Sequence, residues 1–198
     1  MTLQPGRSRR RAGRPDGLPA ADGTSAPARD PEALAREVCL RMLTRTPRTR
    51  AQLAEGMRRR GVPEDAAETV LGRFEDVGLI DDAAFARAWV DSRHHGRGLA
   101  RRALAHELRH RGVADDVVRE AVDGLDRDEE YATAVALATR RLAALHGLPR
   151  DVRIRRAMGA LARKGYQPGL AARALGEALA AEGDSGDVDL DGEAEDWT

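Results

Sequence analysis

The chain has 198 residues, of which 41% are hydrophobic and 3% aromatic, and its 33 basic and 33 acidic side chains leave no formal net charge. The single cysteine, Cys39, excludes an intramolecular disulfide. No stretch reaches the roughly 20 consecutive apolar residues of a membrane helix, and the N-terminus lacks the apolar core of a secretory signal. We therefore expect a cytoplasmic protein without membrane contact.

The charges are unevenly distributed along the chain. Residues 1–29 carry six arginines and two aspartates, whereas residues 184–198 carry seven acidic residues and no base. A basic arm, a slightly basic body and an acidic tail favour a nucleic-acid or nucleoprotein partner, although solvated helix faces produce the same composition. Because neither end has a run that could bury a face, we predict disorder in a basic arm at 1–30 and an acidic tail at 183–198.

Between these ends, apolar residues recur at the helical spacing of three and four, and no alternating strand pattern appears. The predicted helices in chain order are about 31–44, 50–60 and 63–78, then 83–94, 99–111 and 114–125, and finally 128–146, 151–164 and 168–181. Thr49 and Gln52 predict a capping box at the start of the second helix. We therefore predict an all-α fold of three tandem three-helix repeats, at 31–80, 81–126 and 127–182, forming an elongated curved body.

The repeat is visible as a recurring glycine motif. Gly61, Gly112 and Gly165 each follow a basic residue, the first two lie in Arg-Gly-Val, and the glycines are 51 and 53 residues apart. Apolar residues recur at fixed offsets from each glycine: Met57, Leu108 and Leu161 lie four residues before it, and Leu71, Val122 and Leu175 ten after it. A basic last turn followed by glycine is typical of a helix C-terminus. A period near fifty predicts stacked supersecondary units.

One string resembles a zinc-hydrolase motif. His106, Glu107 and His110 match H-E-x-x-H, in which two histidines hold zinc and the glutamate activates water. However, Leu108 is expected to face the core, Arg109 places a cation beside the metal position, and the predicted helix ends at once. The equivalent positions in the other repeats hold no histidine. We interpret the match as coincidence and expect no metal and no catalytic residue.

Basic residues cluster on the second helix of each repeat, where they could align as a discontinuous stripe along one face. Such a stripe is typical of a surface that follows a phosphate backbone or an acidic groove, although arginines in last turns also satisfy helix dipoles. The predicted filament or nucleic-acid contacts are Arg58, Arg59, Arg60, Arg97, Arg101, Arg102, Arg109, Arg111, Arg153, Arg155, Arg156, Arg163 and Lys164. Phe74, Phe85, Trp89 and Tyr166 could stack on bases, but the helical spacing of Phe85 and Trp89 favours a place in the core.

Several strings, in this order, resemble the RecX family of regulatory proteins. They are TRAQL at 49–53, RGV at 60–62, GLIDDAAFARAWV at 78–90, GRG at 96–98, ELRHRGV at 107–113 and RKGY at 163–166. The resemblance covers about residues 33–182. This chain departs from the common pattern in having arginine almost wherever lysine is frequent, and both charged ends lie outside the resemblance.

The resemblance implies tandem three-helix repeats, no enzyme activity, no cofactor, and modulation of the RecA recombinase in DNA repair and recombination. RecX proteins bind along the RecA–DNA filament, usually as inhibitors, so the expected partners are RecA, its DNA filament and single- or double-stranded DNA, with the chain acting as a monomer. The alternative is a sequence-tolerant DNA-binding or helix-turn-helix regulator that uses the same arginines. A zinc metallohydrolase is the remote alternative.

Overall fold

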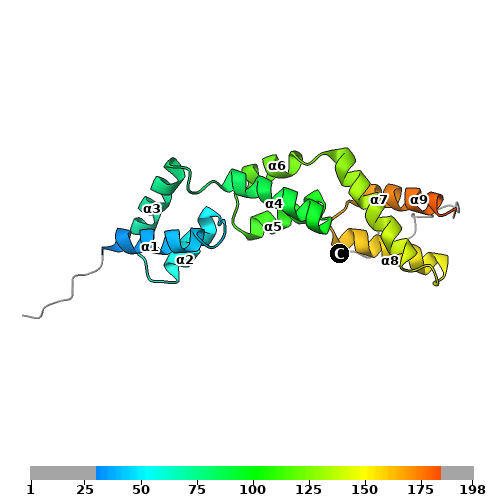
Figure 1. Ribbon diagram of the computed structural model, residues 1–198, viewed down its shortest axis with the longest axis horizontal. Helices are drawn as coiled ribbons and strands as arrows, with labels where there is room; N and C mark the ends of the chain where they lie inside the picture. Colours follow the sequence, from blue (N-terminus) through cyan, green and yellow to red (C-terminus); the bar gives the residue numbers. More distant parts are fainter. Residues whose placement is uncertain (1–29, 184–198) are drawn as a thin grey trace, which may run out of the picture.

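The computed structural model describes residues 30–183, which form nine α-helices and no β-strand (Figure 1). The helices are α1 (Pro31–Leu43), α2 (Arg50–Arg58), α3 (Glu64–Asp76), α4 (Asp82–Arg97), α5 (Arg101–His110), α6 (Asp115–Asp123), α7 (Arg127–Ala143), α8 (Arg150–Arg163) and α9 (Pro168–Ala181). The all-α prediction is confirmed. The disorder predicted for the two ends concerns residues that, apart from Asp30 and Gly183, lie outside the described part of the chain.

One local feature differs from the sequence expectation. α4 continues through Gly96 to Arg97 before Gly98 ends it in the left-handed conformation, with φ +62°. Gly56 lies inside α2, where the Met42 side chain occupies the space that a β-carbon would need. The capping box is confirmed: the backbone N–H of Gln52 donates to Thr49 Oγ1 at 3.2 Å, and the Thr49 N–H donates to Gln52 Oε1 at 3.4 Å.

The repeated glycine motif ends α2, α5 and α8 in the same way. Gly61, Gly112 and Gly165 have φ values of +72°, +77° and +86°. In each case the N–H of the residue after the glycine donates to the carbonyl five residues earlier, as from Val62 to Met57 at 3.2 Å. This is the Schellman geometry, which satisfies the last helix carbonyls and brings the two apolar residues together. The glycine adopts the left-handed conformation, and the apolar residue after it donates the hydrogen bond that closes the turn. These two roles explain why the motif recurs at the ends of all three helices.

Each group of three helices encloses its own apolar core. We call α1–α3, α4–α6 and α7–α9 the first, second and third units. Extensive helix–helix contacts join helices of the same unit. The apolar residues at fixed offsets from the three glycines are all buried, namely Met57, Leu108, Leu161, Leu71, Val122 and Leu175. Two aromatic residues, Phe74 and Tyr166, are buried as well. The last two are therefore core residues and not stacking platforms for bases.

The three units follow one another along the long axis of an elongated body (Figure 1). The first junction joins the first and second units, and the second junction joins the second and third. At each, the start of the second helix of one unit meets the glycine turn of the next: Thr49 Oγ1 donates to the Arg111 carbonyl at 2.7 Å, and the Ala100 N–H donates to the Lys164 carbonyl at 2.9 Å.

A carboxylate from the following unit completes each junction. The N–H of Arg50, at the start of α2, donates to Asp82 at 2.9 Å, and the N–H of Arg101, at the start of α5, donates to Glu130 at 3.0 Å. The first N–H groups of a helix have no partner within the helix and favour an anion. The two junctions thus repeat one solution, in which the next unit supplies the cap.

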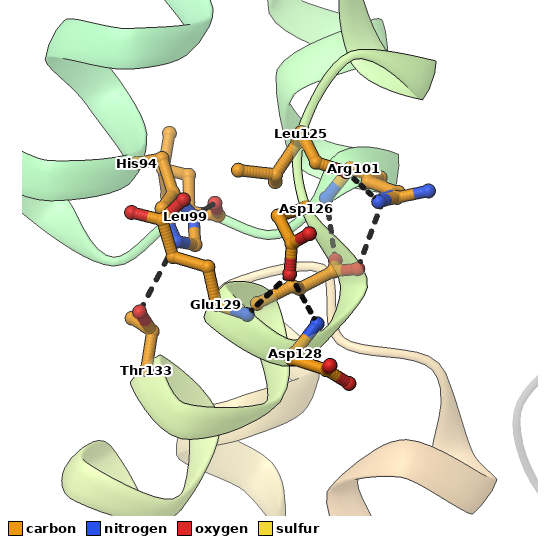
Figure 2. Close-up of polar contacts among 9 residues, drawn as sticks. His94, Leu99, Arg101, Leu125, Asp126, Asp128, Glu129 and Thr133 are labelled. Atoms are coloured by element: carbon orange, nitrogen blue, oxygen red, sulfur yellow. Dashed lines mark hydrogen bonds and ion pairs between the residues drawn. The ribbon is translucent and has the colours of Figure 1, made fainter.

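The second junction has further polar contacts (Figure 2). His94 is buried, and its Nδ1 lies 2.9 Å from the Leu99 carbonyl while its Nε2 lies 3.1 Å from Thr133 Oγ1 in α7. Because a carbonyl can only accept, Nδ1 carries the proton, and in the neutral ring Nε2 accepts from the threonine hydroxyl. His94 therefore ties the end of α4 to α7.

Candidate functional site

The thirteen basic residues predicted to bind a partner lie on the second helices of the units or directly after them, apart from Arg97 at the end of α4. Four of their side chains are partly buried and make contacts within the structure. Arg101 lies 3.0 Å from Glu130 through Nε, in an ion pair without hydrogen-bond alignment, and its Nη2 donates to the Leu125 carbonyl. Arg153 pairs with Glu182, Lys164 donates to the Arg97 carbonyl, and Arg111 covers an aromatic ring.

The other nine are more accessible. Arg58 and Arg59 pair with Glu55, Arg109 with Asp115 and Arg155 with Asp151, while Arg60 donates to the Gly56 carbonyl. The side chains of Arg97, Arg102, Arg156 and Arg163 have no hydrogen-bond or ion-pair partner within residues 30–183. These four are consequently the predicted residues whose charges are available to a partner. The alignment of all thirteen into one stripe stays a prediction.

Trp89 lies at the edge of the second-unit core, against which it packs while only partly buried. Its ring is half-buried, stacks on Phe85 at 5.8 Å and is covered by the guanidinium groups of Arg93 and Arg111, whose central carbons lie 4.1 and 3.7 Å from the ring centroid. Its Nε1 donates to Glu107 at 2.8 Å. Trp89 is therefore a support for two arginines as well as a packing residue.

The Arg111 guanidinium lies over this ring in surroundings that disfavour its positive charge. Burial lowers the pKa of its guanidinium below the ordinary value, and repulsion from Arg93 and Arg48 adds to the shift, while Glu107 opposes it. Arg48 belongs to the first unit, so positive charge from two units meets at the first junction. The approach of Arg93 and Arg48 to Arg111 could not be predicted from the sequence, because the three positions are far apart along the chain.

The geometry of the H-E-x-x-H string argues against a hydrolytic centre. His106 and His110 are exposed on α5, while Glu107 accepts from Trp89 and lies 3.6 Å from Arg93. A general base must face the water that it activates, and this carboxylate is held by an indole and a guanidinium. Over residues 30–183, no group of three or more histidine, cysteine or acidic side chains is arranged to hold a metal ion.

A basic cleft lies in the first unit, between the C-terminal end of α1 and the exposed side of α2. Its volume is about 520 Å³, and its lining includes Arg41, Arg45, Arg48, Arg59 and Arg60 with Glu55 as the acidic residue. Three of these arginines were not among the predicted contacts. The available signal was the density of arginine between positions 41 and 50, which helix-based reasoning passed over because most of this stretch connects two helices.

A second cleft, of about 470 Å³, lies at the second junction. It is lined by Arg101, Arg102, Arg127 and Arg173, but also by Asp128 and Glu130. Tyr131 contributes its ring, and Arg173 stacks on that ring at 4.8 Å. Because acidic groups offset part of the positive charge here, the first-unit cleft is the more strongly basic of the two.

Comparison with known proteins matches the three units to three family models. The models describe the first, second and third three-helix domains of RecX, and they match residues 35–74, 81–122 and 128–175. The chain belongs to the RecX family. "Regulatory protein RecX" of Thermobifida fusca is 60% identical over 168 residues, which cover 85% of this chain and 91% of that protein. The protein of the same name from Mycobacterium marinum is 44% identical over 162 residues, covering 81% of this chain and 92% of its own.

Solved structures support the same fold. The crystal structure of RecX from Lactobacillus salivarius superposes with a TM-score of 0.71 at 17% identity, covering 75% of this chain and 97% of that one. A second regulatory protein RecX has a TM-score of 0.65 at 21% identity, covering 71% of this chain and 70% of its own. The three family models and the 60% identical relative confirm the RecX resemblance predicted from the sequence strings. None of the helices within residues 30–183 is long and apolar enough to cross a membrane.

Proposed function

We propose that this RecX chain binds the RecA recombinase on its DNA filament and restrains strand exchange. Family membership supports a regulatory role, and the relatives carry the name regulatory protein. The observation that carries the proposal is the linear array of three units, each presenting basic residues on its second helix. The proposal places the chain in the cytoplasm as a monomer and assigns it no catalytic step.

The shape of the body suits a repetitive partner. The helices have 9 to 17 residues, which corresponds to lengths of about 14 to 26 Å at 1.5 Å per residue. Three such units in a row form an extended surface that reaches neighbouring protomers of a helical filament. An array that contacts two protomers at once blocks the approach of a second duplex and resists movement of one protomer against the next.

The accessible arginines supply the electrostatic part of this binding. Arg97, Arg102, Arg156 and Arg163 lie on the second and third units without partners in the described chain. Replacing these four by glutamine removes charge while keeping helix propensity nearly constant. Changing Arg101 or Arg111 instead would disturb the second junction or the Trp89 cluster, so these two are poor probes of binding.

The test is RecA-promoted strand exchange with the purified protein. We expect the parent to suppress exchange, and the variant with Arg97, Arg102, Arg156 and Arg163 changed to glutamine to suppress it less while keeping the same helical circular dichroism. The salt dependence of filament binding should also weaken in the variant. If the parent leaves exchange and RecA ATP turnover unchanged at saturating concentration, the proposed function is wrong.

A direct DNA-binding regulator is the second candidate, and it is favoured by the basic cleft of the first unit. The two candidate functions predict different preferences between bare DNA and RecA-coated DNA. A fluorescence titration with bare single strand, duplex and RecA-coated strand separates them, because a filament regulator binds the coated strand more tightly than either bare DNA. Light scattering of the same sample checks the monomeric state.

A further inference from the structure

The first unit has a basic cleft whose charges the protein itself leaves largely uncompensated. Of its five arginines, Arg41 pairs with Glu37, Arg59 with Glu55, and Arg60 donates to the Gly56 carbonyl. The side chains of Arg45 and Arg48 have neither a hydrogen bond nor an ion pair in the described part of the chain. Both are exposed in the connection between α1 and α2. Two guanidinium groups therefore face the cleft without an internal role.

The other residues of the cleft narrow the chemistry of its ligand. Met42 is the apolar side chain in the lining, no aromatic ring contributes, and Gln52 adds a neutral hydrogen-bonding group. Peptide recognition depends on buried apolar or aromatic anchors, and base recognition on stacking platforms. A cleft with neither, lined by several planar guanidinium groups, fits a chain of phosphate groups, because the guanidinium fork binds phosphate through two parallel hydrogen bonds.

We propose that the first-unit cleft, centred on Arg45 and Arg48, is a binding site for the phosphodiester backbone of a nucleic-acid strand. The lining offers no ring on which bases could stack, so we expect contacts to the backbone and not to the faces of the bases. It deepens the proposed function, on which its place in the filament complex rests, by assigning the first unit to DNA and leaving the accessible arginines of the other units for the recombinase. Two sources present this chemistry, a bare strand and the strand inside a filament.

The experiment measures binding of the full chain to a fluorescent single-stranded oligonucleotide, without recombinase, over a range of salt concentrations. The test variant carries Arg45→Gln and Arg48→Gln. The control variant carries Arg36→Gln and Arg87→Gln, which removes the same charge from exposed positions in α1 and α4. The side chains of these two arginines have no hydrogen-bond or ion-pair partner within residues 30–183. A third variant, with Arg45→Lys and Arg48→Lys, keeps the charge but removes the fork.

We expect the test variant to bind the oligonucleotide about tenfold more weakly at low salt and to lose about 1.4 from the slope of log K against log salt, because each phosphate contact on a single strand contributes about 0.7. The control should keep the parent slope, and the lysine variant should keep most of it. Oligonucleotides of different sequence should bind alike. Polyglutamate of equal charge should compete poorly.

Several results would overturn the assignment. They are absence of parent binding to single-stranded and duplex oligonucleotides at low salt, equal losses in the test and control variants, or competition by polyglutamate as strong as by unlabelled oligonucleotide. The last would assign the cleft to an acidic protein segment. Strand exchange is measured in parallel: a parent that binds DNA through the cleft but leaves RecA unaffected contradicts the proposed function alone. A test variant with unchanged DNA binding contradicts the cleft alone.

Discussion

The first and second junctions share three contacts, but the second junction has several more. Both have a hydrogen bond to the carbonyl before the glycine, a carboxylate cap, and a glycine packed against an alanine. The second adds the His94–Thr133 contact, a 2.7 Å ion pair between His95 and Glu129, and the 3.2 Å hydrogen bond from Tyr166 to the Gly98 carbonyl. Ala100, at its centre, belongs to the third-unit core.

The segments that connect the units also favour a tighter second junction, because the first segment is longer than the second. Residues 77–81 join the first two units, whereas residues 124–126 join the last two. A longer connection and fewer cross-links leave the first unit with more freedom to reorient than the third. The second and third units thus form the stiffer block, and the first unit, which carries the basic cleft, is attached through the weaker junction.

Alanine in place of the junction glycines should produce the largest effect. Gly112 and Gly165 have positive φ, and a β-carbon at either would overlap Ala51 or Ala103 of the preceding unit. At Gly61 φ is also positive, but nothing lies within 4 Å of that β-carbon. We expect Gly61→Ala to cost about 1 kcal/mol from backbone strain alone, and Gly112→Ala about 2 to 3 kcal/mol.

Gly165→Ala should exceed both, at about 3 to 4 kcal/mol, because its neighbours include the Ala103 backbone and the tighter junction cannot move apart. Urea unfolding of the three variants gives the comparison directly. Equal losses at positions 61, 112 and 165 would show that the junction packing contributes nothing beyond the glycine conformation.

Truncation of Trp89 probes the side of the first junction where Arg48 and Arg111 meet. The ring is half-buried, so Trp89→Ala should destabilise by about 2 to 3 kcal/mol, less than the loss of a fully buried aromatic. Trp89→Phe keeps the ring and drops the donor to Glu107, and we expect a loss of about 1 kcal/mol. Thermal unfolding measures both. If the alanine variant unfolds like the parent, Arg111 does not depend on the ring for its position.

The carboxylate caps give a smaller difference between the junctions. Glu130 is buried, accepts the Arg101 N–H and pairs with its guanidinium, whereas Asp82 is half-buried and accepts the Arg50 N–H. We expect Glu130→Gln to cost about 2 kcal/mol, because the amide weakens the charge-assisted bonds of this carboxylate. We expect Asp82→Asn to cost less than about 1 kcal/mol, because the amide also removes a charge that burial disfavours. Amide hydrogen exchange should show the loss at Arg101 and Arg50. A larger effect at Asp82 would reverse the ranking of the two junctions.

Much of this fold could be predicted from the sequence because its signals are local. Helical spacing, the Thr49–Gln52 capping box and the glycine turns each depend on residues within about one or two helical turns. The repeat offsets identified core residues such as Met57, Leu108 and Leu161 for the same reason, since a repeated unit buries equivalent positions.

The site was less predictable because its contacts join distant parts of the chain. Arg101 looks like any basic residue in its helix until Glu130 and the Leu125 carbonyl are placed beside it. Trp89 was expected in the core, but Arg111 approaches from beyond the next helix. Arg45 and Arg48 lie in a connection with no periodicity to assign a face. Side-chain partners across units leave no trace in spacing, so the basic residues could be identified but not divided into structural and available ones.

The smallest expected effect is a difference in pH dependence between the two connections. Burial raises the pKa of Asp82 above its ordinary value, with the Arg50 N–H opposing and Glu75 and Asp81 reinforcing the shift. Asp126, exposed at the start of α7, has its pKa lowered by the N–H groups of Glu129 and Asp128. The signs of their contributions to stability are therefore opposite.

The Asp82 contribution is fully present below the pKa of the unfolded chain, about 3.9, and is lost as pH rises through the higher folded value. The Asp126 contribution is present above that unfolded pKa and is lost as pH falls through the lower folded value. We expect the stability of the parent relative to Asp82→Asn to decline as pH rises from about 3 to 6, and its stability relative to Asp126→Asn to increase over the same range. Asparagine caps a helix about as well as aspartate, so the second variant isolates the charge. Urea unfolding at a series of pH values measures both differences in stability. If the two differences change with pH in the same direction, Asp82 is not more deeply buried than the exposed Asp126.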